Sequence, residues 1–312
     1  MRKAFLTLLL ALTAASVMTV VPALASMNER SGSAGSTRSY PATSARSYPA
    51  TAARSGDDLD VIGLTTDGRL VRFDSKRPGR TRSLGLVSGL SGDTSLVGID
   101  YRVQDGMLYG VGNAGGIYTV SDRNAAATKV SQLTVALNGT QFGVDFNPAA
   151  NRLRVISDTG QNLRHNIDDP AGAPPAGTTA TDGTLTIPPA TAAATGVTGA
   201  AYTNNDLDPN TATTLFDLDT NLDQVAVQSP ANAGNLAPTG KLRVDTGSAA
   251  GFDIYSTVRG GTTVGARAFA TLQVGGRSAF FTVSLLTGNA SPVDFFRARD
   301  QVTDIAIPLN QR

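Results

Sequence analysis

The chain has 312 residues, no cysteine, no tryptophan and a single histidine, and its 26 basic and 25 acidic side chains nearly balance. Without cysteine there can be no disulfide, thiolate nucleophile or cysteine-ligated zinc, and one histidine excludes two-histidine metal motifs. The only glutamate is Glu29, and the 33 glycines and 15 prolines favour a turn-rich, all-β protein.

The first 25 residues have the pattern of a secretory signal peptide. Arg2 and Lys3 make the start positive, an apolar stretch of 18 residues runs from Ala4 to Val21, and Pro22 to Ala25 form a small-residue cleavage site. The alternative is an uncleaved anchor, although this stretch is borderline for spanning a membrane. We therefore expect cleavage before Ser26, a secreted, periplasmic or cell-envelope protein, and no membrane span after cleavage.

Residues 26 to 56 are rich in Ser, Ala, Pro and Arg, and an octad occurs twice in them, from Arg38 to Ala45 and from Arg46 to Ala53. The stretch has no apolar periodicity and cannot bury a core, so we expect a disordered linker. A basic, tyrosine-bearing arm that touches an envelope polyanion is the alternative. From residue 57 onward the chain has 20 basic and 24 acidic side chains, and this mildly acidic balance predicts no nucleic-acid partner.

A strand pattern recurs five times beyond residue 57, at a period that is typical of propeller blades. Equivalent positions are spaced by 45, 56, 52 and 53 residues. In the first four repeats a second strand, a short turn and a third strand follow, with Gly, Asn or Asp in the turns. The five copies are Val97 to Tyr101, Phe142 to Phe146, Thr198 to Tyr202, Ala250 to Ile254 and Thr303 to Ile307.

Four antiparallel strands for each repeat would make one blade of a propeller. The second and third strands of each repeat are the segments that we can place from the sequence. They are Met107 to Val111 and Ile117 to Val120, Arg152 to Ser157 and Asn162 to Asn166, Thr214 to Leu218 and Gln224 to Gln228, and Ala266 to Leu272 and Ser278 to Leu285.

The two ends of the repeat region predict how the ring closes. The fifth copy is not followed by a second strand, while the first strands of the domain, Leu59 to Leu64 and Leu70 to Asp74, lack an inner partner. Joining them completes a blade and removes exposed strand edges. We predict an all-β, five-bladed propeller over residues 57 to 312, closed by its N- and C-terminal strands. A six-bladed ring is the alternative, because the 56-residue step contains the stretch Pro170 to Thr195, which we assign to a long loop.

Two runs within this region resemble a known family. One is Phe146 to Arg164, FNPAANRLRVISDTGQNLR, and the other combines Gly199 to Asn205, GAAYTNN, with Thr213 to Asp219, TTLFDLD. They resemble a bacterial family catalogued as domain of unknown function 4394, and the resemblance extends over about residues 59 to 308. It implies an extracytoplasmic, propeller-like domain, and it carries no established activity.

Five charged side chains are the candidate binding residues. Asp100, Asp145 and Asp253 occupy the same place in three inner strands and would form a partial ring beside the central channel. Such a ring could hold Ca²⁺ or supply the paired carboxylates of a glycosidase. Alternatively, each aspartate could bind backbone N–H groups or an arginine of the adjacent blade, and we favour this structural role. Arg152 and Arg154 share one face of a covered strand, so we expect one of them to pair with Asp145 or Asp100, with anion binding as the alternative.

Two further motifs are interpreted as structural. Asp206 and Asp208, with Asp217 further on, match a calcium loop only superficially, because Thr211 replaces the required glycine and the final glutamate is missing. His165 lies in an expected strand, and no Gly-x-Ser-x-Gly elbow is present, so we expect a half-exposed strand residue and no catalytic triad. The sequence predicts no catalytic residue, no metal site and no cofactor.

These observations favour a secreted, non-catalytic binding or scaffold module for an extracellular glycan or protein ligand. The alternative is an extracellular hydrolase that acts on a glycan or lactone through aspartates near the channel. A domain without glutamate and with one histidine has few ways to assemble an acid and a base of separated pKa. The sequence therefore favours binding over catalysis.

Overall fold

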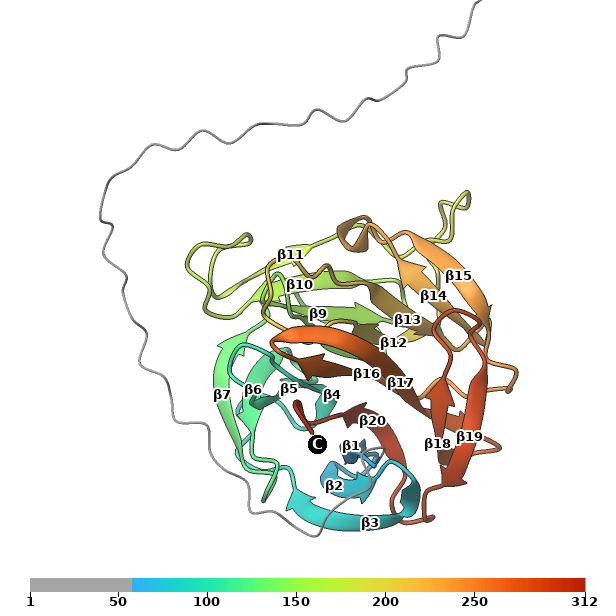
Figure 1. The fold of residues 1–312 in the computed structure, drawn as a ribbon. Coiled ribbons are helices and arrows are strands. Elements are labelled where there is room, and N and C mark those ends of the chain that lie inside the picture. The colour runs from blue at the N-terminus through green and yellow to red at the C-terminus, as the bar shows by residue number, and fades with distance from the viewer. Residues whose placement is uncertain (1–57, 312) are drawn as a thin grey trace, which may run out of the picture. The chain divides into compact units, whose positions relative to one another are not determined.

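The computed structural model describes residues 58–311, and these residues form five four-stranded antiparallel sheets around a central axis (Figure 1). Each sheet is one blade of a propeller. The five-bladed architecture predicted from the sequence is confirmed, and the six-bladed alternative is wrong. The expected signal peptide, residues 1–25, and the expected linker, residues 26–56, lie outside the described residues.

Blade 1 is built from both ends of the described chain. Strand β20 pairs antiparallel with β1, and Ile62 lies opposite Ala306. The Gln311 side chain reinforces this closure, since its Nε2 donates to the Asp60 carbonyl at 2.8 Å and its Oε1 accepts the Asp60 N–H at 2.6 Å. The predicted pairing of the terminal strands is confirmed. From the axis outward, the strands are β20 (Val302–Ala306), β1 (Asp60–Thr65), β2 (Arg69–Asp74) and β3 (Arg77–Leu86).

The other four blades each consist of consecutive strands, and the recurring pattern forms the innermost strand of each. In the third blade the residues that we assigned to one long loop contain the outermost strand, so that assignment is corrected. The strands are β4 (Leu96–Tyr101), β5 (Leu108–Gly112), β6 (Gly116–Val120), β7 (Ala127–Gln132); β8 (Phe142–Asn147), β9 (Arg152–Ser157), β10 (Asn162–Asn166), β11 (Thr178–Thr181); β12 (Val197–Tyr202), β13 (Leu215–Asp219), β14 (Gln224–Gln228), β15 (Leu236–Lys241); and β16 (Ala250–Arg259), β17 (Thr262–Val274), β18 (Arg277–Val283), β19 (Ala290–Phe295).

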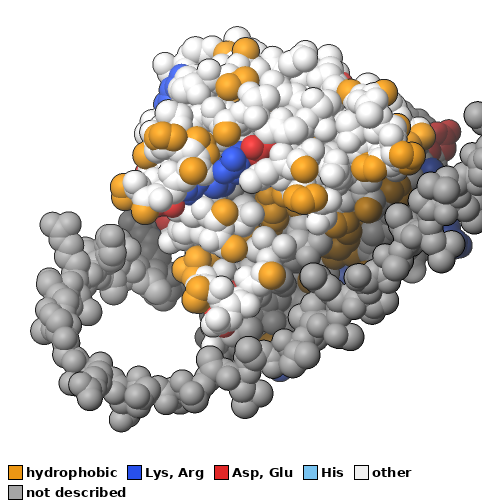
Figure 2. Space-filling view, turned by 90° about the horizontal axis from the view of Figure 1, so that it is seen from above, with side chains coloured by type: hydrophobic (Ala, Val, Ile, Leu, Met, Phe, Trp, Pro, Cys, Tyr) orange, Lys and Arg blue, Asp and Glu red, His pale blue; other side chains and the backbone are white. Residues whose placement is uncertain are grey.

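Helix is nearly absent from residues 58–311, where the one helical element is the 3₁₀ turn Ala231–Ala233. No helix of this part of the chain has the length and apolar character needed to cross a membrane. On the face shown in Figure 2, hydrophobic side chains are scattered in small groups and charged side chains are few. This face therefore offers no single extended apolar patch.

Apolar side chains fill the spaces between neighbouring blades. Between blades 5 and 1, the Phe280 ring meets Phe73 edge-on at 5.2 Å and stacks on Phe269 at 5.5 Å between ring centroids. Close to the axis the packing requires glycine, because a Cβ at Gly143 would lie 2.6 Å from the Ala200 nitrogen. The backbones of the inner strands thus approach more closely than side chains would permit.

The β16–β17 hairpin is longer than the corresponding strand pair in any other blade. Strand β17 pairs with β18 only as far as Ala268, which lies opposite Val283, and before that point its strand partner is β16. The end of the hairpin is held by the loop after β12, where the Asp206 carboxylate accepts the Thr263 N–H at 2.8 Å. Strand β17 begins four residues before the predicted start at Ala266, because its pairing with β16 extends to Thr262.

Candidate functional site

The inner strands bring three aspartates to the axis of the propeller. Asp100 on β4, Asp145 on β8 and Asp253 on β16 each follow an inner-strand glycine by two residues, so they share one register. The corresponding residues of the other two blades are Ala201 and Ala306. One carboxylate oxygen from each aspartate lies within 4.8 Å of those of the other two. The partial ring expected from the sequence is therefore assembled by the fold.

These three carboxylates, together with that of Asp304, link each of four blades to its neighbour. Each accepts a backbone N–H from the inner strand of the next blade or, in the case of Asp253, from the residue that follows that strand. The pairs are Asp100 with Phe146 at 2.8 Å, Asp253 with Ile307 at 2.6 Å, Asp304 with Ile99 at 2.8 Å, and Asp145 with Tyr202. Charge-assisted hydrogen bonds of this type are stronger than neutral ones. The preferred interpretation from the sequence is that the inner-strand aspartates bind backbone N–H groups or an arginine of the adjacent blade, and the contacts are those with N–H groups.

Burial raises the pKa of all four axial carboxyl groups. Each residue is 4% to 7% exposed, and nearby carboxylates raise the pKa of Asp100, Asp145 and Asp304 further. At Asp253 burial raises the pKa to about 7, against the opposing effect of its backbone hydrogen bonds. Several buried carboxylates at such short distances cannot all be ionised without a positive charge among them. The cluster must be neutralised either by protons or by a bound cation.

The donor set would suit a hard cation. Carboxylate oxygens are the ligands that Ca²⁺ and Mg²⁺ prefer, so Asp100, Asp145 and Asp253 could hold such an ion. However, Ca²⁺ takes about six to eight oxygen ligands, and the carboxylates of this cluster already accept N–H groups of the next blade. We therefore expect protons to neutralise the cluster, and the absence of a metal site stays a prediction.

The proton state of the cluster can be tested through the pH dependence of thermal stability. In the unfolded chain an aspartate has a pKa of about 3.9, and folding raises this value, to about 7 at Asp253. Protonation therefore favours the folded state. The stability that the aspartates contribute is fully present below about pH 4 and is lost as the pH rises toward 7. Replacing Asp253 with Asn removes one of the titrating carboxyl groups but keeps a side-chain oxygen that can accept the Ile307 N–H. We expect Asp253→Asn to melt higher than the parent protein at about pH 8 and to lose this advantage at about pH 4.

His165 also makes the thermal stability depend on pH, in the opposite direction. Because the parent protein and Asp253→Asn both contain His165, its effect cancels when their melting temperatures are compared. Burial lowers the pKa of His165 to about 4. The stability that the neutral imidazole contributes to the fold is therefore lost as the pH falls below about 6.5, and this happens in both proteins. The same melting curves are recorded with added Ca²⁺ and with a chelator. If Ca²⁺ raises the melting temperature of the parent at neutral pH but not that of Asp253→Asn, a cation rather than protons neutralises the cluster.

Arg152 and Arg154 do not pair with the axial aspartates, and the expectation that one of them meets Asp145 or Asp100 is wrong. The Arg152 Nη1 lies 3.0 Å from Asp169 Oδ2, and the Arg154 Nη1 lies 2.7 Å from Asp182 Oδ2. Although Arg154 is opposite Asp145 in register, its long side chain extends outward past Asn162 on β10 to Asp182, which lies in the segment that we had assigned to a loop. Asp169, the partner of Arg152, immediately precedes that segment. An ion pair is present, but its partner comes from the periphery of the blade. Whether either arginine binds a ligand stays a prediction.

Arg154 is the centre of a buried polar network between blades 3 and 4. Its Nη1 and Nη2 donate to the side-chain oxygens of Asn162 and Asn232, each at 2.7 Å, and its Nε donates to the Tyr202 hydroxyl at 3.3 Å. Asp217 on β13 is also buried, and neither of its carboxylate oxygens has a hydrogen-bond partner within residues 58–311. Burial raises the pKa of Asp217 well above its usual range, against the effect of the Arg154 charge. Burial in the fold therefore favours the neutral form of Asp217.

His165 is fully buried, which corrects the expectation of a half-exposed residue. Its Nε2 lies 2.9 Å from Ser131 Oγ on β7, and its Nδ1 lies 2.9 Å from Thr179 Oγ1 on β11. The imidazole thus links blade 2 to blade 3. Both of these partners are hydroxyl groups, whereas a catalytic triad uses a carboxylate to orient the histidine. The contacts of His165 are those of a structural residue.

The loop that resembles a calcium motif holds the long hairpin. The Asp206 carboxylate accepts the N–H groups of Thr263 and Asp208, and the Asp208 carboxylate accepts that of Asn210 at 2.9 Å. Asp217 lies in strand β13 instead of this loop. Within residues 58–311, the axial aspartates are the only group of three acidic or histidine side chains close enough to share a metal ion. The interpretation of this loop as a structural turn agrees with these contacts.

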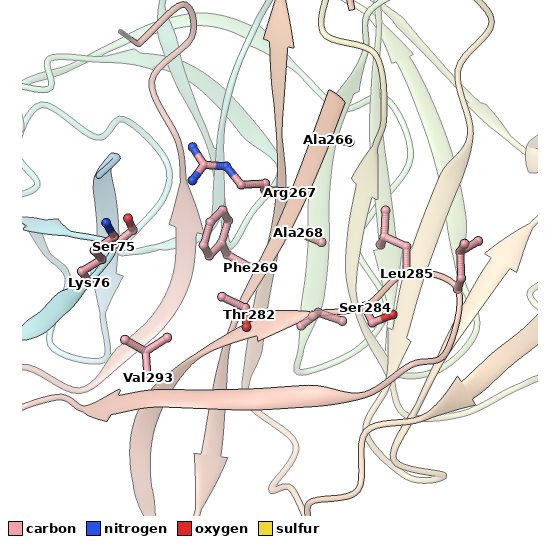
Figure 3. Close-up of a pocket in the computed structure, with 12 residues that line it drawn as sticks. Ser75, Lys76, Ala266, Arg267, Ala268, Phe269, Thr282, Ser284, Leu285 and Val293 are labelled. Atoms are coloured by element: carbon pink, nitrogen blue, oxygen red, sulfur yellow. The ribbon is translucent and has the colours of Figure 1, made fainter. Parts of the chain in front are cut away.

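A groove beside blade 5 was not foreseen from the sequence (Figure 3). Its volume is about 560 Å³, which is within the range of about 300–1,000 Å³ for ligand pockets. It is lined by β17, the end of β18 with the loop that follows, and the turn after β2. Figure 3 shows Arg267 and Lys76 toward one end and Leu285 toward the other. The groove is therefore cationic at one end and apolar along most of its length.

Comparisons with known proteins identify the family of this chain. The solved structures that resemble it include a protein of unknown function from Bacteroides thetaiotaomicron (13% identity, covering 82% of this chain and 70% of that chain, TM-score 0.43). They also include a protein from Lactobacillus plantarum (13% identity, covering 80% of this chain and 99% of that chain, TM-score 0.39) and an auxiliary nutrient binding protein from Bacteroides ovatus (11% identity, covering 74% of this chain and 58% of that chain, TM-score 0.38). Because the TM-scores are below 0.5, these similarities give no information about the ligand or the activity of this chain. No curated protein matches the sequence. The sequence matches the family described as Domain of unknown function (DUF4394) over residues 69–306, and the chain therefore belongs to that family.

Proposed function

We propose that the propeller is a secreted, non-catalytic binding module whose ligand site is the groove beside blade 5. The observation that carries this proposal is that all four axial carboxyl groups have raised pKa values and link neighbouring blades. The acids at the axis are thus engaged in holding the ring together. The groove, by contrast, is an open site, and none of the four axial carboxylates lines it. The pattern of residues 1–25 supports export.

The alternative is hydrolysis of a glycan or lactone by the axial aspartates. The close approach of Asp100, Asp145 and Asp253 favours this alternative, because paired carboxylates are the usual catalysts of glycoside hydrolysis. Such catalysis requires one protonated acid and one ionised carboxylate, whose environments push their pKa values apart. Here burial shifts the pKa values of all three in the same direction. Binding without catalysis is therefore the better-supported function.

A hydrolysis screen separates the two functions. We expect the chain from Ser26 onward to leave a panel of glycan and lactone substrates intact, and Asp145→Asn to behave in the same way. Asp294→Asn, which alters an exposed acid on β19, is the matched control. Turnover by the parent and by Asp294→Asn that disappears in a folded Asp145→Asn protein would show that the axial cluster is an active site.

A further inference from the structure

The groove beside blade 5 lies at the place where β18 ends and β17 continues. Strand β18 ends at Val283, opposite Ala268, while β17 extends back to Thr262. The groove is lined by four consecutive residues of β17, from Ala266 to Phe269, and by Thr282 to Leu286 at the end of β18 (Figure 3). Successive side chains of a strand point to opposite faces, so a lining of four consecutive residues places the groove at the edge of the strand. The groove is the space that a longer β18 would have filled.

The first residues of β17 pair with a strand on one side only. Thr262 to Ala266 form what we call the β17 edge: they pair with β16, and within residues 58–311 no second strand pairs with them. Alternate residues of an antiparallel strand direct their N–H and C=O groups away from a given partner. One such donor is used by the loop after β12, since the Thr263 N–H donates to the Asp206 carboxylate. Val264 to Ala266 are exposed, so their backbone can pair with another strand.

The β17 edge lacks features that protect the outer edges of the blades. Proteins block exposed strand edges with prolines, with charged side chains, or by keeping the strand short. The β17 edge has the sequence TTVGA, which contains neither a charge nor a proline. The outermost strands do have such features, namely Pro78 in β3, Lys129 in β7, Pro238 in β15, Pro292 in β19, and a length of only four residues in β11. The β17 edge is thus open to pairing in a way that the outer edges are not.

Apolar side chains adjoin this edge. Val264 on the edge is 60% exposed and Leu286 beside the groove is 82% exposed. Phe269, Val283 and Val293 continue the apolar surface within the groove. Single exposed apolar residues are ordinary, but apolar residues that adjoin a concave apolar surface are typical of a binding site. A strand added to β17 would bury alternate side chains against this surface.

We propose that the groove binds an extended polypeptide segment of a partner protein, which adds to the β17 edge as a further strand in line with β18. The proposal rests on the binding function proposed above and names its ligand class. Main-chain hydrogen bonds to the edge provide affinity, and alternate apolar side chains in the groove provide specificity. The ligand needs no charge, because its recognition depends on the backbone and on apolar contacts. The added strand continues the ladder that β17 and β18 already form.

The direct test is calorimetric titration of the chain from Ser26 onward with the uncharged peptide acetyl-STVTVTS-amide, in which valine and threonine alternate. We expect saturable binding of one equivalent. Two further peptides carry methyl groups on the backbone nitrogens of the valines or on those of the threonines. Only one of these two sets of nitrogens faces β17 in a ladder. One methylated peptide should therefore bind at least about tenfold more weakly than the probe, and the other should bind within about threefold of it.

Variants assign the binding to the edge and to the groove. Ala266→Lys introduces the charge that protects other edges and should abolish binding of the probe. Leu286→Ser removes an apolar contact and should weaken the probe about tenfold. Both residues are exposed, so both variants should keep the parent melting temperature. The matched controls are Ala192→Lys and Leu86→Ser, which change exposed residues outside the groove lining and should bind as the parent does.

Three results would overturn the proposal and leave the binding function standing. They are a lack of saturable binding of the probe, equal affinities for the two methylated peptides, and equal losses in the groove variants and in the two controls. Hydrolysis that disappears in Asp145→Asn would instead refute the binding function itself, so the two failures are distinguishable.

Two other occupants of the groove are tested with the same proteins. Tighter binding of the probe after deletion of residues 26–56 would show that this segment of the chain competes for the groove. Dimers in analytical ultracentrifugation that dissociate in Ala266→Lys would show that a second copy pairs with the β17 edge. Either result would replace the partner protein with this chain itself and refute the proposal.

Discussion

A chain that ends at Asp300 should fail to form the propeller. The truncation removes β20, the inner strand of blade 1, and with it the buried side chains of Val302, Ile305 and Ile307. Burial of each such side chain stabilises a protein by about 1.5–3 kcal/mol, and their sum is comparable to the typical stability of about 5–15 kcal/mol for a whole domain. The edge of β1 would also lose its hydrogen-bonded partner.

The truncation also removes two of the contacts that link blades at the axis. Asp304 no longer accepts the Ile99 N–H, and Asp253 loses the Ile307 N–H. Circular dichroism during thermal melting measures the effect, and the matched control is a chain from which residues 26–56 are deleted. We expect the control to melt like the parent. Similar melting temperatures for the control and the C-terminal truncation would contradict the closure model.

Arg154→Ala should destabilise the domain by about 3 kcal/mol, the lower end of the range for a broken buried pair, because Arg164 still pairs with Asp182. Arg154 is 2% exposed, and its removal leaves the Asp182 carboxylate, itself largely buried, without its shortest cationic contact. Breaking a buried pair from one side is costly because the remaining charge stays desolvated. The side-chain oxygens of Asn162 and Asn232 lose a donor as well. Urea unfolding monitored by circular dichroism gives the free energy of unfolding.

Arg77→Ala is the matched control, since Arg77 pairs with Asp74 at 3.1 Å but its side chain is 57% exposed. An exposed pair contributes about 0–1 kcal/mol, so this variant should stay close to the parent. The double variant Arg154→Ala with Asp182→Ala should lose less than the sum of the two single losses. A loss of under about 1 kcal/mol for Arg154→Ala would show that the network contributes little to stability.

The axial cluster could be predicted in part. The sequence places Asp100, Asp145 and Asp253 at one position of a repeated strand, and a shared register in a ring brings them to the axis. Backbone N–H groups were expected as one kind of partner, but the residues that supply them could not be predicted, because the sequence does not show which residue of the next blade lies beside each carboxylate. Asp304 was missed as a member, since it occupies the position that glycine holds in the other four blades.

The inner strands and the closure of the ring are predicted by the sequence alone, which also favours five blades over six. These features depend on local patterns, namely the spacing of glycine and apolar residues and the unmatched strands at the two ends. Only the tertiary structure decides the partners of Arg154, the burial of His165 and the groove beside β17. The Arg154 and His165 side chains both reach a neighbouring blade, and the groove forms where β17 extends beyond the end of β18. Contacts between segments far apart in the sequence are set by the relative placement of the blades, which no local pattern encodes.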